Sequence, residues 1–439
     1  MAIDIATVWD VRANGDVDNG GGFVAGASGT DHSQQDAAWA AYTDLAIDGA
    51  DNTIITSAAI PFAADDVGNL IKILSGIGFT PGWYEIVSVG GVQATLDRAC
   101  GATGSTGGVG NLGGAVTLVD EVLEASTDGN IYYVKNDATH TLTAHISILN
   151  FGSTAGASSI VGYNSTHGDE PVGDDRPLVA CGAYSFSLAN FWNKSNLRFT
   201  TTSVAGVITG TNSFVSNCRF ENSGPNRNAA TPGQYAMYLN CEFTGANGDE
   251  KGANVLGSSV RFIDCYFHDL NQGIFVSNDY MVVVGCVFDT IAAAAAIEHD
   301  SSGDEFHTVV GNVFYNCLEV VYSLASPRGY AFVRNIFKSN TVVIDMGSLS
   351  HNAFFDWNIW DNTLDIAAGE LWVKGPNAIN GDPGFVDAPG KDFTVPLGSN
   401  AIDAFLARTG VGLVGDYKIN IGVDQGEHAA AGGGGNNWW

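Results

Sequence analysis

The sequence predicts an all-β protein: a right-handed parallel β-helix solenoid with a small N-terminal β-rich cap domain and a C-terminal closing segment. One tetrapeptide that ends in an aromatic residue recurs eight times. Its copies are NLRF (196–199), NCRF (217–220), NCEF (240–243), DCYF (264–267), GCVF (285–288), GNVF (311–314), RNIF (334–337) and WNIW (357–360). The aromatic residues are 21, 23, 24, 21, 26, 23 and 23 residues apart. A period of this length is typical of stacked-repeat architectures.

Further short strands are predicted between the tetrapeptides, and turn residues separate these strands from one another. After Phe267, for example, come GIFVS and YMVVVG, with Asn278 and Asp279 between them. Three short strands and three turns per period form one coil of a parallel β-helix. Leucine-rich repeats have a similar period, but their Leu-x-x-Leu-x-Leu pattern is absent. An ordinary β-sandwich whose strands resemble one another by chance is the alternative.

Stacked coils place equivalent residues about 4.8 Å apart, so each position of the tetrapeptide forms a ladder. In Cys218-Arg219-Phe220 the first and third side chains share one face, and the middle one takes the other. We therefore expect unbridged, inward-facing cysteines beneath stacked aromatic rings, and inward asparagines that bond to the coils above and below. The members are Phe199, Phe220, Phe243, Phe267, Phe288, Phe314, Phe337 and Trp360 in the aromatic ladder, and Cys218, Cys241, Cys265 and Cys286 in the cysteine ladder.

The composition limits the classes of partner. The chain has 18 Lys and Arg against 47 Asp and Glu, a formal net charge of -29. This charge argues against nucleic acid and against an acidic membrane surface. The apolar runs are too short to span a membrane. No Cys-x-x-Cys pair and no paired His spacing occurs, so we expect no metal site and no cofactor. The N-terminal MAIDIATVWD lacks the features of a signal peptide, which together with free thiols predicts maturation in a cytoplasm.

The elements follow in four segments. Residues 1–125 read as the cap or attachment domain, with a short helix over 33–45, strands in NTIITS, NLIKILSG, WYEIVSV and ATLDRA, and a long glycine-rich loop over 99–115. Such a cap covers the otherwise open edge of the first coil. Residues 126–380 form the coils, residues 381–425 close them, and residues 426–439 form a glycine-rich tail.

The closing segment carries a resemblance. It resembles the last segment of many right-handed parallel β-helix proteins, which has the form Asp-Pro-x-Phe-Val-Asp, Asp-Phe-x-Leu, Gly-Ser-x-Ala-Ile-Asp and Asp-Ile-Gly-Ala. The matching residues are Asp382, Pro383, Phe385, Val386, Asp387, Asp392, Phe393, Gly398, Ser399, Ala401, Ile402 and Asp403, whereas Asn420 replaces the usual Asp. The N-terminal block, from WDVRANGDVDNGGGF to ATLDRA, resembles the leader of β-helix proteins encoded by tailed bacteriophages and environmental viral sequences.

The resemblance implies where a site would lie. The pectate-lyase-like superfamily includes pectate lyases, polygalacturonases and phage tailspike glycosidases, which place carboxylates on one outer sheet of the helix. The best candidate here is IEHDSSGDEFH (297–307) in the longest coil, which is expected to bulge outward. Its residues Glu298, His299, Asp300, Asp304, Glu305 and His307 are the candidates for an acid–base or metal site, and FHD (267–269) lies one coil earlier. The alternative is a solvated loop on a very acidic protein.

The resemblance to phage proteins implies a structural virion protein: an appendage, fibre, spike or capsid decoration, assembled as a homotrimer in the host cytoplasm. The alternatives are a carbohydrate-active, tailspike-like glycosidase or polysaccharide lyase that acts on a surface glycan, and a self-assembling surface or filament protein. Basic residues are scarce, so the base of a lyase is hard to place.

The tail ends in two large apolar rings. Gly432 to Gly435 predict a flexible tether, and Trp438 and Trp439 follow it. Aromatic anchors are favoured at interfaces, so we expect both tryptophans to contact a neighbouring subunit or another structural protein.

Overall fold

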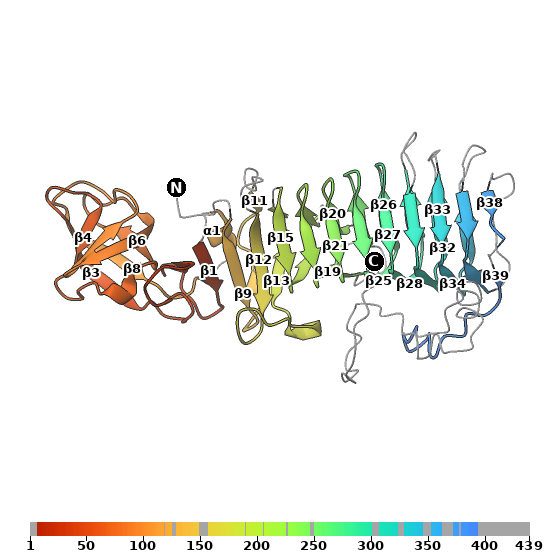
Figure 1. Ribbon diagram of the computed structural model, residues 1–439, viewed down its shortest axis with the longest axis horizontal. Helices are drawn as coiled ribbons and strands as arrows, with labels where there is room; N and C mark the ends of the chain where they lie inside the picture. The colour runs from red at the N-terminus through yellow and green to blue at the C-terminus, as the bar shows by residue number, and fades with distance from the viewer. Residues whose placement is uncertain are drawn as a thin grey trace.

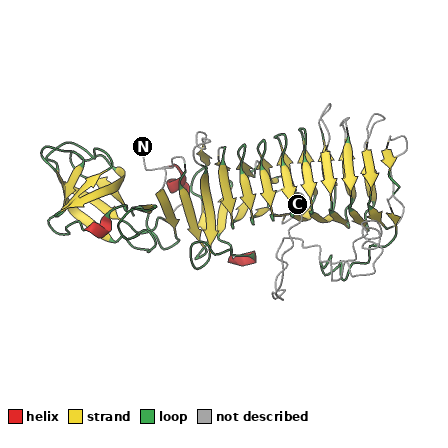
Figure 2. Ribbon diagram, in the orientation of Figure 1, coloured by secondary structure: helices red, strands yellow, loops and turns green. Residues whose placement is uncertain are grey.

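The computed structural model of the chain describes residues 7–393, except 118, 125–128, 149–156, 189, 205, 225–226, 246–249, 301–306, 324–328, 346–352, 362–371 and 377–378. It shows a long stack of strands that follows an N-terminal barrel (Figure 1). Nearly all of the regular structure is β (Figure 2). No helix in this part of the chain has the length and apolar character needed to cross a membrane.

Three parallel sheets form the solenoid. Sheet 1 runs in the order β2 (Gly22–Val24), β1 (Thr7–Val11), β9 (Ile131–Lys135), β12 (Ser158–Tyr163), β15 (Trp192–Ser195), β18 (Phe214–Ser216), β21 (Met237–Leu239), β24 (Arg261–Ile263), β27 (Val282–Val284), β30 (His307–Val310), β33 (Tyr330–Val333), β36 (Ala353–Asp356), β38 (Trp372–Lys374). Only β2 pairs antiparallel. Since β1 pairs with β9, this sheet begins within the segment 1–125.

Sheets 2 and 3 take the next two strands of each coil. Sheet 2 consists of β10 (His140–Thr141), β13 (Leu178–Gly182), β16 (Arg198–Thr201), β19 (Arg219–Asn222), β22 (Glu242–Gly245), β25 (Tyr266–Leu270), β28 (Val287–Ile291), β31 (Val313–Tyr315), β34 (Ile336–Lys338), β37 (Ile359–Trp360) and β39 (Ile379–Asn380). Sheet 3 consists of β11 (Ile146–Ile148), β14 (Phe186–Leu188), β17 (Val207–Thr209), β20 (Asn228–Pro232), β23 (Lys251–Val255), β26 (Gln272–Val276), β29 (Ala295–His299), β32 (Glu319–Ser323) and β35 (Val342–Asp345). The predicted all-β parallel β-helix is therefore confirmed.

The recurring tetrapeptide links sheet 1 to sheet 2, and each of its positions has a separate physical role. Its first residue takes a positive φ, for example 50° at Asn217, 53° at Asn240 and 51° at Asp264. Asn, Asp and Gly tolerate this left-handed conformation best. The second and fourth side chains point into the core, and the third points outward. The residue types that recur are thus those that the corner between sheets 1 and 2 requires: one that tolerates a positive φ, followed by two that fit into the core.

Register keeps the aromatic rings on top of one another. Phe199 pairs with Phe220, Phe220 with Phe243, and the series continues to Trp360. From Phe199 to Phe337 the successive ring centroids lie 4.5–5.4 Å apart. All eight aromatic side chains are buried. Burial of each ring contributes roughly 1.5–3 kcal/mol, so this ladder is a main source of stability.

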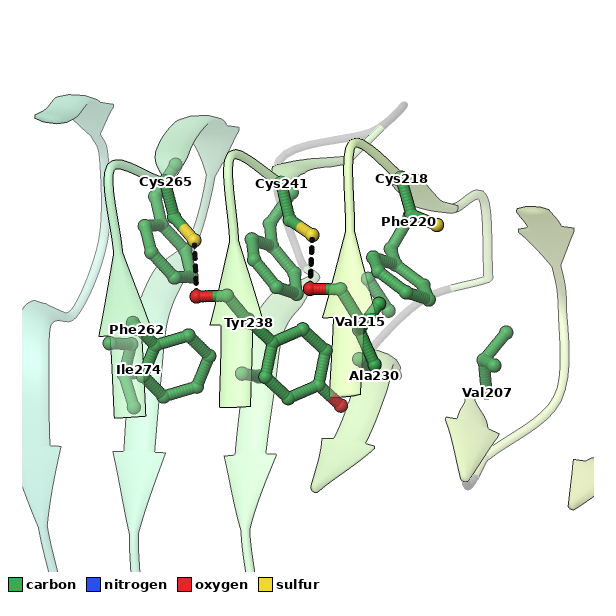
Figure 3. Close-up of a cluster of buried hydrophobic side chains, with 14 of the residues drawn as sticks. Val207, Val215, Cys218, Phe220, Ala230, Tyr238, Cys241, Phe262, Cys265 and Ile274 are labelled. Carbon is green, nitrogen blue, oxygen red and sulfur yellow. Dashed lines mark hydrogen bonds between the residues drawn. The ribbon is translucent and has the colours of Figure 1, made fainter. Parts of the chain in front are cut away.

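The second position changes from cysteine to asparagine along the solenoid. The thiols are buried and unbridged, and those of Cys241 and Cys265 donate to the carbonyls of Val215 and Tyr238, both at 3.6 Å (Figure 3). From Asn312 on, each amide oxygen accepts the backbone N–H of the preceding coil: Asn335 Oδ1 accepts Asn312 N at 2.9 Å. A buried polar ladder of this kind is stable only because every member finds a partner.

The N-terminal segment contains a closed six-stranded barrel made of β3 (Ala40–Ile47), β4 (Ile54–Thr56), β7 (Gln93–Leu96), β6 (Gly82–Gly90), β5 (Leu70–Ser75) and β8 (Thr106–Leu112). The helix expected over 33–45 is wrong. Ser33 does not cap a helix; instead its N–H and hydroxyl both donate to Asp31. Tyr42, Leu45 and Ile47 enter the barrel core, because closure of the barrel gives β3 the partner strand β8.

The glycine-rich stretch 99–115 is also not a loop throughout, since it supplies β8. A side chain at Gly108 would lie 2.6 Å from the ring of Phe79. Glycine therefore serves here to let a strand pass close to an aromatic ring inside the barrel. The remaining regular elements are the short helix α1 (Val119–Glu124) and the 3-10 turns η1 (Ala64–Asp66) and η2 (Gly173–Asp175).

The beginning of the closing segment packs on the outer face of sheet 2. Ala388 and Phe393 form one apolar cluster with the outward side chains Tyr266, Val287, Val313, Ile336 and Ile359. These are the third residues of successive tetrapeptides, which are apolar from Tyr266 onward and polar at Arg219 and Glu242. The covered half of sheet 2 is therefore the apolar half.

Candidate functional site

Sheet 3 presents a two-row outer face that combines carboxylates, an aromatic pair and one cation. We call this set the sheet 3 site: Lys251, Gln272, Phe275, Glu298, Glu319, Tyr322 and Asp345. In β23, β32 and β35 two consecutive residues are buried between outward ones: in β32, Val320 and Val321 lie between Glu319 and Tyr322. The outward residues therefore fall into two rows along the solenoid axis.

Register fixes the order within the rows. In one row Phe275 pairs with Glu298, Glu298 with Tyr322, and Tyr322 with Asp345. In the other row Lys251 pairs with Gln272, and Glu319 with Val342. Neighbouring positions in a row are about 4.8 Å apart. An extended ligand that ran along the axis would thus meet these side chains in succession.

Contacts between the rows orient Glu298. The Gln272 amide donates from Nε2 to Glu298 Oε2 at 2.5 Å. The Lys251 ammonium lies over the ring of Phe275, 4.2 Å from its centroid, in a cation–π contact. Lys251 and Phe275 therefore hold each other beside Glu298, and one oxygen of Glu298 is fixed by an amide.

The environment favours the protonated form of two carboxyls. Partial burial raises the pKa of Glu298, whereas the Lys251 ammonium lowers it and the Asp300 carboxylate raises it. Burial also raises the pKa of Glu319, and the carboxylates of Asp345 and Glu298 add to this effect. Carboxyl groups that share a face resist simultaneous ionisation. Such a face can supply a proton donor next to an ionised carboxylate.

The predicted cluster at 297–307 is divided by the fold. Glu298 faces outward and Asp300 is exposed, but His299 and His307 are fully buried inside the solenoid. Their rings lie 5.0 Å apart, and that of His307 is 4.8 Å from Tyr330. Burial, and then the charge of His299, lowers the pKa of His307 to about 3. The expectation that both histidines bulge outward is wrong, because they are the inward residues at the ends of β29 and β30.

Other predicted members are separated or lie elsewhere. Asp304 and Glu305 lie outside the described residues, as do Trp438 and Trp439. His268 does not join Glu298, because β25 belongs to sheet 2. There it contacts Glu242 at 2.9 Å and Asp269 at 2.7 Å. Within the described ranges no group of three or more His, Cys, Asp or Glu residues has a geometry that would hold a metal ion.

Sequence reasoning missed most of the sheet 3 site. Tyr322 and Asp345 follow Glu298 at intervals of 24 and 23 residues, which are the same as the coil period. A search for polar and aromatic residues in register with Glu298 would have found both. Adjacent acidic residues instead pointed to the stretch 297–307, because adjacency in the sequence does not show which side chains the coil turns inward.

Comparisons with known proteins find similar solved structures but no match by sequence. No protein family model matches the sequence, and no curated protein matches it. The solved structure of pectate lyase Pel9A is 13% identical, with a TM-score of 0.47 over 63% of this chain and 79% of that one. A family 6 polysaccharide lyase from Pseudopedobacter saltans is 9% identical, with a TM-score of 0.34 over 63% and 94% of the two chains.

A rhamnogalacturonan lyase is 10% identical, with a TM-score of 0.37 over 62% of this chain and 86% of that chain. At these identities the likeness concerns the fold only. The order of the strands in the three sheets confirms the parallel β-helix fold that the resemblance to pectate-lyase-like proteins implies. The resemblance to phage proteins stays a prediction.

Proposed function

We propose that the protein is carbohydrate-active and hydrolyses a glycosidic bond of a polysaccharide bound along the outer face of sheet 3. The observation that carries this proposal is Glu298, an outward carboxyl of raised pKa in line with Tyr322 and Asp345. Glycoside hydrolysis needs one protonated carboxyl to protonate the leaving oxygen and one carboxylate as base or nucleophile. Glu298 serves as the acid and Asp345 as the base.

The charges on this face favour hydrolysis over elimination. A lyase acting on a polyuronate needs cations to offset the uronate carboxylates and a base to remove a proton. The sheet 3 site has three acidic residues and one cation, Lys251, whose ammonium already lies over Phe275. A polyanionic chain would be repelled by such a face. The substrate is therefore a neutral or amino-sugar polysaccharide.

The spacing of the two carboxyls predicts the stereochemistry. Glu298 and Asp345 lie on strands β29 and β35, with β32 between them. Two strand spacings amount to about 9.6 Å between the backbones. Side chains on backbones this far apart suit the roughly 6.5–9.5 Å carboxyl separation of inverting enzymes better than the roughly 5 Å of retaining ones. We expect the product to be released with an inverted anomeric configuration.

The test is reducing-sugar release from a panel of neutral and amino-sugar polysaccharides. Glu298→Gln and Asp345→Asn should each lower the rate at least about 100-fold, the usual contribution of a general acid or base. Glu221→Gln, a matched change on the outer face of sheet 2, should leave the rate unchanged. Release by the Glu298→Gln protein at the unmodified rate would contradict the assignment, and so would the absence of any hydrolysed polysaccharide.

The virion location and the structural appendage function stay predictions. A protein that hydrolyses a surface glycan is compatible with a tailspike-like particle component, so the proposed chemistry and the predicted location do not compete. Particle fractions of the source, probed with antibody to the protein, test the location separately.

A further inference from the structure

The turn that leads from sheet 3 back to sheet 1 carries bulky residues where the backbone disfavours them. In successive coils one residue of this turn has a positive φ: Phe191 (59°), Asn212 (53°), Tyr235 (57°), Ser259 (61°) and Tyr280 (60°). Its N–H donates to a carbonyl of the next coil, as Tyr235 N does to Ser258 O at 2.9 Å. From Phe191 to Tyr280, every second coil therefore carries an aromatic residue in a left-handed conformation.

Folding gives no reason for tyrosine at these positions. A left-handed backbone is strained for bulky residues, whereas asparagine tolerates it, as at Asn212. Burial does not offset this strain, because Tyr235 is 54% exposed and Tyr280 is 45% exposed. Strained, exposed aromatic residues at regular positions are typical of surfaces that bind a ligand.

A groove of about 500 Å³ lies at the same turns, and the residues that precede Phe191 and Tyr235 in the chain belong to its lining. Its lining includes Asn190, Thr211, Gln234, Leu256, Ser258 and Asn278, and none of its lining residues carries a charge. Phe191 follows Asn190 in the chain, and Tyr235 follows Gln234. Amide and hydroxyl groups are thus placed next to aromatic rings, without a formal charge, on a protein of net charge -29.

The rings recur at a distance that suits a repeating ligand. Tyr235 and Tyr280 are two coils apart, which corresponds to about 9.6 Å along the axis. This distance is comparable to the length of a disaccharide. Sugar rings stack on aromatic faces through their C–H groups, and amides and hydroxyls bond to their hydroxyl groups. An uncharged lining fits a neutral chain and provides no cation to pair with a carboxylate or a sulfate.

We propose that this groove is a second glycan-binding site, which holds a neutral polysaccharide chain by stacking on Tyr235 and Tyr280. The substrate class in this proposal rests on the proposed function, because the groove would hold the same polysaccharide that the sheet 3 site hydrolyses. The groove borders the strands β17 and β20, and the sheet 3 site continues along the same sheet to β35. One polysaccharide laid along the axis would therefore reach both sites.

Affinity gel electrophoresis tests the proposal with dextran, galactomannan and hydroxyethylcellulose as neutral probes and polygalacturonate as the charged one. We expect at least one neutral probe to retard the unmodified protein and polygalacturonate to leave it unretarded. The double variant Tyr235→Asn, Tyr280→Asn should bind the retarding probe about tenfold or more weakly, which corresponds to ~1.4 kcal/mol. Tyr184→Asn, an exposed tyrosine outside the groove, is the matched control.

Asparagine is the residue that the same turn already uses, so the double variant should melt at or above the temperature of the unmodified protein. A lower melting temperature would show that the tyrosines act in folding and would overturn the proposal. Equal retardation of the double variant, or no retardation by any neutral probe, would also overturn it. Retardation that Glu298→Gln retains while hydrolysis is lost supports both sites. Retardation in a protein that hydrolyses nothing would refute the proposed function alone.

Discussion

Single residues in this solenoid are governed by whether they point into or out of the core, and Lys194 shows this most sharply. It lies on β15 in line with Ile160 and Val215, and its side chain is fully buried. Its ammonium nitrogen has no hydrogen-bond partner within the part of the chain that the structure describes. Burial lowers the pKa of Lys194 to about 7, while Cys218 raises it slightly. A lysine thus occupies a position that neighbouring coils fill with apolar residues.

This lowered pKa predicts how stability depends on pH. Between pH 7 and about 10.4 the unfolded chain binds a proton at Lys194 that the folded protein does not bind, so stability rises with pH across this window. The slope is about 1.4 kcal/mol per pH unit. Lys194→Met should raise the free energy of unfolding below pH 7 and remove this slope. Urea denaturation of both proteins at several pH values measures the free energy of unfolding. The same pH dependence in the Lys194→Met variant would contradict a buried, neutral lysine.

The charges around Glu298 predict opposite shifts of the alkaline limb of the activity profile. A general acid loses activity as pH rises through its pKa. The Lys251 ammonium lowers the pKa of Glu298, so Lys251→Met should move the limb to higher pH. The Asp300 carboxylate raises that pKa, so Asp300→Asn should move the limb to lower pH. Profiles of kcat/KM against pH for both variants test this; shifts of the same sign would refute the acid role of Glu298.

Elements of this fold are stabilised by ladders in which each coil depends on its neighbours. Phe243 stacks on Phe220 and Phe267 and is fully buried. Phe243→Ala should cost roughly 3–5 kcal/mol of stability, because the solenoid cannot collapse around the cavity. Ile77→Ala, at an exposed position between β5 and β6, is the control and should cost far less. Thermal or urea unfolding of both variants measures the loss of stability. Equal losses would contradict a stabilising role of the aromatic ladder.

The asparagine ladder predicts a cost that is due to hydrogen bonds. Asn335 Oδ1 accepts both the backbone N–H and the amide of Asn312, at 2.9 and 3.0 Å, and its own amide donates to Val309 O. Asn335→Ala leaves these buried groups unpaired, at about 1–3 kcal/mol for each. Hydrogen exchange should then speed up at the Asn312 N–H before it does so elsewhere. Unchanged protection of this amide would contradict the ladder.

At the scale of the whole molecule, the described part of sheet 1 offers an outward apolar row for the predicted trimer. The outward side chains of sheet 1 include the half-buried Leu239, Ile263, Val284, Val310 and Val333, together with Phe214 and Phe354, which are 37% and 45% exposed. Contiguous apolar patches of this kind mark protein–protein contacts. Sheet 2 is partly covered by the closing segment and the sheet 3 site is acidic, so sheet 1 is where we expect copies to meet.

Sedimentation velocity tests this expectation. The unmodified protein should sediment as a trimer, and the double variant Ile263→Asp, Val284→Asp should sediment as a folded monomer, because the added charges would be buried in the interface. Val386→Asp, at an exposed position of the closing segment, should remain trimeric. A monomeric unmodified protein would refute the trimer, and a trimeric double variant would place the contact elsewhere.

The sequence by itself determined the solenoid. The corner between sheets 1 and 2 admits few residues: a left-handed Asn, Asp or Gly, an inward Cys or Asn, and an inward aromatic ring. The repeat is therefore visible in the sequence, because local geometry and burial restrict the residue types at this corner of every coil. The same reasoning failed in the barrel, where the sequence of β3 suggests a helix and that of β8 a loop. Both are strands because closure of the barrel gives each of them partner strands on both sides.

Only the tertiary structure decided the candidate site. In the sequence, Glu298 and His299 look equivalent as members of one acidic stretch, yet one faces solvent and the other lies in the core. Tyr322 and Asp345 are far from Glu298 along the chain and become its neighbours through the register of β29, β32 and β35. A repeat specifies which residues share a ladder, but pKa values depend on three-dimensional burial and on charges from other coils, which no single stretch of sequence contains.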